Sequence, residues 1–175
     1  MPTPRPDCRL LASLLLCLLV PAGLRAQVGV AATGLAGVSF DIDDRDPVTG
    51  GGVAGIADLG VVLREIEFGA EFGDHGLGHG RGARQYGAYA RFWPPVRGRA
   101  APYLVVGLAS YHYYPVPGNH SHAFGGSLGG GVRFPILGSR AGTLVEVRFH
   151  SSFDRIRLLS TQEFISGMLG LRLDL

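Results

Sequence analysis

The chain has 175 residues, enough for one domain, and a formal net charge of +2. Removing residues 1–26, which have the pattern of a signal peptide, takes away three of the 16 basic and one of the 14 acidic residues, so the remainder is neutral and lacks the basic field that nucleic-acid binding requires. Both cysteines, Cys8 and Cys17, leave with it, which excludes a disulfide, a thiolate metal site and a cysteine nucleophile.

Residues 1–26 carry the features of a secretory signal peptide. Arg5 and Arg9 give a basic start, Leu10 to Val20 form an apolar run, and PAGLRAQ contains a cleavage site after Ala26. The apolar run is too short for a helix that spans a bilayer, and no later stretch reaches the ~18 apolar residues that such a helix needs. We therefore expect an exported domain at residues 27–175 that could enter a membrane only with strands.

The rest of the chain alternates apolar and polar residues in short runs, which predicts strands because successive side chains point to opposite faces. The predicted strands span residues 28–40, 52–61, 65–73, 85–93, 102–113, 123–134, 143–153 and 164–175. Longer connectors at 41–51, 74–84, 114–122 and 154–163 alternate with tighter ones at 62–64, 94–101 and 135–142. Long loops at one end and turns at the other predict an all-β, eight-stranded antiparallel up-and-down barrel.

Each predicted strand has one apolar face and one small or polar face, except 102–113, which is apolar on both faces and does not decide the orientation. A soluble, lipocalin-like barrel turns its apolar faces inward to bind a ligand, whereas a transmembrane β-barrel turns them toward lipid. Strands of ~9 to 12 residues fit a tilted membrane crossing. Aromatic residues also gather near strand ends, as an interfacial belt requires: Tyr86, Phe92, Trp93, Tyr103, Tyr111, Tyr113, Tyr114, Phe134, Phe153 and Phe164. Both features favour the membrane barrel.

The polar faces carry charges of both signs. In the stretch GTLVEVRFHSS, Glu146, Arg148 and His150 share the face opposite Val145 and Val147. Because desolvated charges must be paired, we predict a network in the lumen. Its expected members are Glu65, Glu67, Glu71, Arg91, Arg133, Glu146, Arg148 and Arg172. An eight-stranded barrel is just wide enough for its own side chains, so no large pore is expected.

The signal peptide and the stretches APYLVVGLASY, GGSLGGGVRFP, LVEVRFH and GMLGLRLDL resemble the small eight-stranded outer-membrane barrel proteins of Gram-negative-type bacteria, the OmpA/OmpX-like and porin-like group. The resemblance covers residues 27–175. It implies an integral outer-membrane protein with a structural or surface-contact role, surrounded by outer-membrane lipids, with no cofactor and no enzymatic activity. In that family the assembly machinery recognises an aromatic residue at the end of the last strand. Leu175 stands there instead, so insertion should be less efficient.

His150 and Ser152 carry an enzymatic alternative. Outer-membrane lipid A deacylases share the eight-stranded fold and have a histidine and a serine two residues apart in their acyl hydrolase site, a spacing similar to this one. A hydroxyl beside an imidazole is the minimum arrangement for acyl transfer. The Asn-containing stretch of that family is missing, however, and alternation places both side chains toward the lumen. A structural role for His150 beside Glu146 is therefore favoured.

Four histidines, His75, His79, His120 and His122, fall in two predicted long loops at the same end of the barrel. Their imidazoles could bind Zn²⁺ or Cu²⁺ if these loops converged. The stretch DHGLGHGRG carries no ordering signal, so solvent-exposed histidines are the favoured interpretation. The acidic stretch DIDDRDPVTGGG lacks the glycine and the closing glutamate of an EF-hand, which favours a solvated loop.

Overall fold

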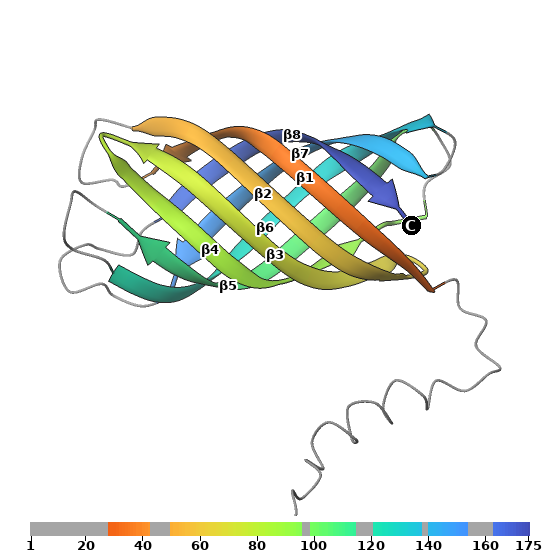
Figure 1. Cartoon of the computed structure of the whole chain (residues 1–175), viewed down its shortest axis with the longest axis horizontal. Helices are drawn as coiled ribbons and strands as arrows, with labels where there is room; N and C mark the ends of the chain where they lie inside the picture. The colour runs from red at the N-terminus through yellow and green to blue at the C-terminus, as the bar shows by residue number, and fades with distance from the viewer. Residues whose placement is uncertain (1–27, 43–49, 96–98, 115–120, 138–139, 154–162) are drawn as a thin grey trace, which may run out of the picture.

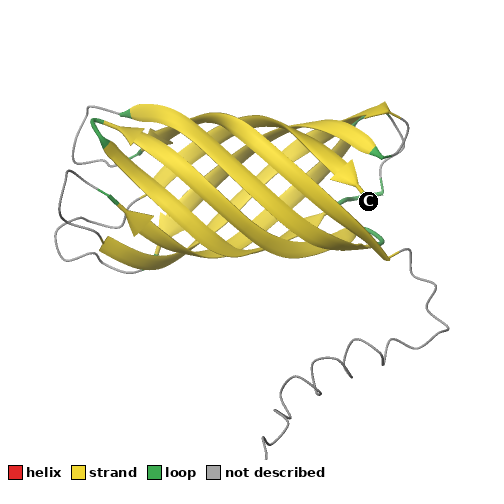
Figure 2. Ribbon diagram, viewed as in Figure 1, coloured by secondary structure: helices red, strands yellow, loops and turns green. Residues whose placement is uncertain are grey.

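The computed structural model describes residues 28–42, 50–95, 99–114, 121–137, 140–153 and 163–175. The strands are β1 (Val28–Asp41), β2 (Gly51–Leu63), β3 (Ile66–Gly78), β4 (Arg81–Phe92), β5 (Ala101–Tyr113), β6 (Ser121–Leu137), β7 (Ala141–Ser152) and β8 (Glu163–Asp174). They close into one barrel in which sequence neighbours pair and β1 pairs antiparallel with β8 (Figures 1 and 2). The predicted eight-stranded antiparallel barrel is confirmed.

The up-and-down order gives the barrel two different ends. The β2–β3, β4–β5 and β6–β7 connections lie at one end together with Val28 and Leu175, and we call this the turn end (Figure 1). The remaining connections lie at the opposite end, the loop end. Within the described ranges, no helix is long and apolar enough to cross a membrane. The predicted signal peptide, residues 1–26, lies outside the described residues.

The β3–β4 connection differs from the prediction. The long loop expected at residues 74–84 is mostly strand, because β3 runs to Gly78 and β4 begins at Arg81. His79 at the tip has φ 52°, and Gly78 and Gly80 on either side have φ 80° and 75°, a region that glycine adopts without steric cost. Glycines obscured the alternation because they have no side chain to mark a face. The flanking residues that continue it into the interior are His75, Leu77 and Ala83.

The apolar side chains face outward. Phe68, Val147 and Leu171, on three different strands, are 51%, 53% and 60% exposed, whereas their charged neighbours along each strand are buried in the closed barrel. A soluble barrel with an apolar ligand cavity has the reverse arrangement, so the lipocalin-like alternative is wrong. An apolar exterior that runs around the whole barrel is the surface of a barrel that contacts lipid.

The predicted aromatic belt is only partly correct. Tyr86, Phe92, Phe134 and Phe153 are exposed on the outside. The predicted members that are instead buried in the interior are Tyr103, Tyr111, Tyr113 and Phe164, and Trp93 packs against the interior cluster. Nearness to a strand end does not decide which face a side chain takes. On β5 the alternation itself was undecided, because apolar and aromatic residues occupy both of its faces.

Val147 lies midway along β7 on the lipid-facing side, which makes the outward assignment testable. Val147→Arg should lower the free energy of unfolding by about 2 to 4 kcal/mol, because it places a charge near the midplane of the bilayer. Val53→Arg, close to the loop end of β2, is the matched control and should cost only about 0 to 1 kcal/mol. Equal effects of the two substitutions in denaturant unfolding of bilayer-folded protein would contradict the assignment.

Candidate functional site

The interior of the barrel holds a cluster of charged side chains centred on Arg91 of β4. The guanidinium of Arg91 donates from Nη1 to Glu67 Oε1 at 3.0 Å and from Nη2 to Asp58 Oδ2 at 3.1 Å. A longer contact of 3.4 Å joins Nη2 to Glu146 Oε2 on the opposite wall. Arg91 and its partners are fully buried. One arginine thus connects β2, β3 and β7 across the lumen.

Two further arginines extend the cluster in both directions. Arg148 on β7 donates from Nε to Glu146 at 2.5 Å and from Nη1 to Glu71 on β3 at 2.6 Å. Arg172 on β8 donates from Nη1 to the second oxygen of Glu67 at 2.5 Å. Charge-assisted contacts of this kind are the strong hydrogen bonds of proteins. We call these seven residues the lumenal network: Asp58, Glu67, Glu71, Arg91, Glu146, Arg148 and Arg172.

Two tyrosines complete the centre of the lumenal network. The Tyr89 hydroxyl donates to Glu67 at 2.5 Å, and the Tyr103 hydroxyl donates to Glu146 at 2.7 Å. The guanidinium carbon of Arg91 lies 5.0 Å and 5.1 Å from the two ring centroids, within the range of cation–π attraction. The carboxylates are therefore bonded from two sides, by arginine and by phenol.

Toward the loop end the lumenal network continues through neutral side chains. Gln85 donates from Nε2 to Glu71 Oε1 at 3.1 Å, so its own Oε1 is left to accept from His75 Nε2 at 3.3 Å. His75 Nδ1 then accepts from the Ser39 hydroxyl at 3.0 Å. This order of donors and acceptors assigns the proton of a neutral His75 to Nε2. The polar contacts run from the charged centre to β1 near the loop end.

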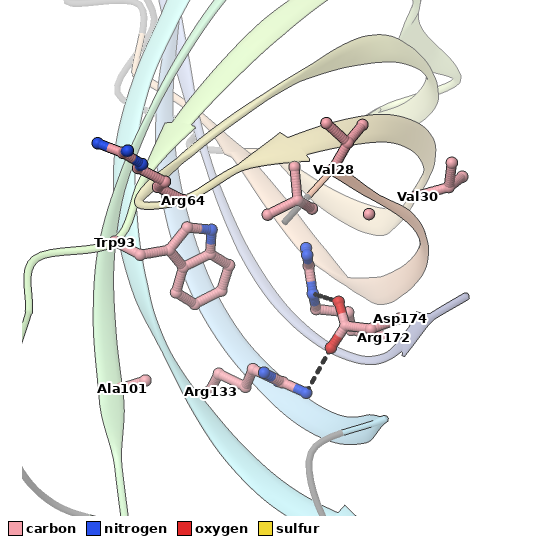
Figure 3. A pocket seen from close by; sticks show the side chains of 10 residues that line it. Val28, Val30, Arg64, Trp93, Ala101, Arg133, Arg172 and Asp174 are labelled. Carbon is pink, nitrogen blue, oxygen red and sulfur yellow. Dashed lines mark hydrogen bonds and ion pairs between the residues drawn. The ribbon is translucent and has the colours of Figure 1, made fainter. Parts of the chain in front are cut away.

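At the turn end, a pocket of about 390 Å³ opens into the barrel. Arg133 and Arg172 both donate to Asp174, at 2.7 Å and 2.8 Å, as the dashed lines in Figure 3 show. The Arg172 guanidinium lies 5.1 Å from the Trp93 ring centroid. Because Arg172 also binds Glu67, the inner wall of this pocket is part of the lumenal network.

Six of the eight charges predicted for the lumen come together there, and two lie elsewhere. Glu65 is exposed, because β2 ends at Leu63 and Glu65 belongs to the turn that follows. Arg133 is half-buried at the turn end and pairs with Asp174 rather than with the centre. The six that meet are Glu67, Glu71, Arg91, Glu146, Arg148 and Arg172.

Three residues at the centre of the lumen were not predicted from the sequence to lie there. Asp58 is the single acid of β2 and faces inward opposite the exposed Leu59, but the short connector predicted at 62–64 does not fix the register of the second strand. Tyr89 shares the face of Arg91 by alternation, but a pattern of charges does not select a tyrosine. Tyr103 was assigned to the belt, since no pattern distinguishes an interfacial tyrosine from one that binds a buried carboxylate.

His150 and Ser152 both lie inside the barrel and are fully buried. The two ring nitrogens of His150 lie 3.1 Å from the hydroxyls of Tyr111 and Ser166. His150 is thus engaged by these two hydroxyls and not by Ser152, and its expected contact with Glu146 is replaced by them. Both side chains therefore face the lumen and not the lipid-facing surface.

The four histidines considered for a metal site do not converge. His75 is buried in the lumen, His79 is exposed at the tip of the β3–β4 hairpin, and His122 is exposed on the outside of β6. His120 lies outside the described residues. The described part of the chain contains no group of three or more His, Cys, Asp or Glu side chains that could hold a metal ion. The main reason is that β3 continues through His75 and turns this side chain into the lumen, away from the other histidines.

No protein-family model and no curated protein matches the chain. Among solved structures, it is similar to neisserial surface protein A, with a TM-score of 0.71 over 82% of this chain and 96% of that one at 12% identity. It is also similar to the N-terminal β-barrel domain of OprF from Pseudomonas aeruginosa, with a TM-score of 0.62 over 84% and 99% at 12% identity. The fold is that of an eight-stranded outer-membrane β-barrel. The resemblance inferred from the sequence is confirmed at the level of the fold.

The lumenal network should contribute to stability through Arg148. Arg148→Ala removes the arginine that pairs with both Glu71 and Glu146 and leaves Glu71 with the neutral Gln85, which should lower the free energy of unfolding by about 3 to 5 kcal/mol. The matched control is Arg84→Ala, which removes an ion pair with Asp74 that lies in solvent and should change stability little. Denaturant unfolding of the folded barrel measures both, and a neutral Arg148→Ala would show that water, not Arg148, solvates these carboxylates.

Proposed function

We propose that the protein is an integral outer-membrane barrel with a structural or surface-contact role, whose lumen is closed to solutes by its own side chains. The observation that carries this proposal is the lumenal network inside an apolar exterior. Its three arginines bind four carboxylates from β2, β3 and β7, all fully buried. Outer-membrane lipids surround the exterior, and the outer-membrane assembly machinery is the partner during insertion.

The geometry of the lumenal network argues against transport through the barrel. A solute would have to displace arginines that each hold two or three partners across the lumen, for example Arg91 with Glu67, Asp58 and Glu146. Separating a buried pair leaves an uncompensated charge, which is strongly unfavourable. Porins with an aqueous channel have about 16 to 18 strands, whereas the interior of an eight-stranded barrel is just wide enough for side chains to fill it. The barrel therefore acts as an anchor.

The role of an anchor then depends on what it presents at its ends. In outer-membrane barrels the turns face the periplasm and the longer loops face outward, which assigns the loop end to the cell surface. One similar barrel is itself described as a surface protein. Export through the signal peptide at residues 1–26 is consistent with this location. The proposed role is non-enzymatic, and the complete burial of His150 and Ser152 in the lumen supports it.

Conductance tests the closed lumen directly. Purified protein added to a planar bilayer should show no current steps of porin size, because the lumenal network fills the section of the barrel. A 16-stranded porin measured in the same bilayer is the positive control. Steps comparable with that porin would overturn the closed lumen. Recovery of the exported chain in a soluble fraction, without detergent, would overturn the membrane location.

A further inference from the structure

Two histidines face each other on the outer wall of the barrel, close to the loop end. His112 of β5 and His122 of β6 are direct partners in the strand register. Their ring centroids are 4.2 Å apart, with the planes inclined at 57°. Their neighbours Tyr111 and Tyr113 on β5 point into the barrel, so the two imidazoles lie outside it, His112 half-buried and His122 exposed.

The charged neighbour of this pair in the strand register already has an acidic partner of its own. The residue paired with His112 on the other side is Arg84 of β4. The Arg84 guanidinium binds Asp74 of β3 at 2.9 Å and 3.0 Å. Toward the turn end from this pair the outer wall becomes apolar, and Leu108 and Phe124 there are more than half exposed. The imidazoles thus lie at the boundary between the apolar band and the polar loop end.

We infer that His112 and His122 form a two-histidine site for a divalent transition metal ion, with water in the remaining coordination positions and Cu²⁺ bound more tightly than Ni²⁺ or Zn²⁺. Imidazole nitrogen is a preferred ligand of all three ions, and the affinity order follows the general trend for such ligands. An imidazole has two nitrogens, so one can bind metal while the other keeps a hydrogen bond.

The backbone arrangement makes this pair a better ligand than two loop histidines. Both side chains are fixed on adjacent hydrogen-bonded strands, so binding does not require a loop to close. A bound ion would connect β5 to β6 and therefore stabilise the folded barrel by mass action. This site differs from the four-histidine site considered from the sequence: it includes neither His75 nor His79. It is also independent of the proposed anchor role, because it lies outside the lumen.

The test uses exported, tag-free barrel folded in detergent, titrated with Cu²⁺ and followed by electron paramagnetic resonance and thermal unfolding. We expect nitrogen coordination by two imidazoles and a rise in the unfolding midpoint that a chelator reverses. His112→Asn and His122→Asn should each weaken Cu²⁺ binding by about tenfold or more. The matched control is His79→Asn, which removes a single exposed histidine at the β3–β4 tip and should leave binding unchanged.

Unchanged Cu²⁺ affinity in either His112→Asn or His122→Asn overturns the inference, and so does loss of binding in His79→Asn. Thermal unfolding without metal shows whether each variant is folded. His122→Gln offers a second substitution at the exposed position should His122→Asn fail to fold. Conductance and membrane fractionation do not depend on this site, so its failure and the failure of the anchor role are distinguishable.

Discussion

Closure of eight strands is the constraint on which the rest of this structure depends. Pairing of β1 with β8 leaves no strand edge, so every strand can form backbone hydrogen bonds with two neighbours, as a lipid environment requires. The same closure encloses an interior that is just wide enough for side chains to fill. Because the outer face contacts lipid, alternation turns the charged side chains of the middle section inward, where they are paired with one another.

The glycine-rich composition follows from the same constraint. Tyr89 reaches its carboxylate partners by crossing over Gly60 and Gly69, where a Cβ atom would collide with its ring or hydroxyl. Tyr103 crosses over Gly131 in the same manner. Large inward side chains are thus accommodated by glycines on the neighbouring strands. These glycines leave room for the two tyrosines that bind carboxylates of the lumenal network.

Period-two alternation predicted the barrel well, because lipid outside and polar side chains inside impose it on strands such as β7 and β8. It failed where that contrast disappears. The glycines around His75 and His79 hid a continuing strand, and the two apolar faces of β5 hid the inward tyrosines. Charge type predicted the lumenal network but not its limits: Glu65 has the right chemistry and parity yet falls one residue beyond the strand. Which carboxylate meets which arginine depends on register across strands, which no single strand encodes.

The polar side chains in the lumen are already paired, and this limits which residues are available to bind other molecules. Arg91, Arg148 and Arg172 are bound to carboxylates of the same chain, and His150 is held between two hydroxyls, so these side chains are committed to holding strands together. Polar groups on the outside near the loop end, such as Arg84 and His122, remain in contact with water. In the proposed role, contact with other molecules is therefore left to the outer wall and the loop end, and the lumenal network holds the strands together. The alternation that builds the barrel thus also separates its stabilising residues from those available for contact.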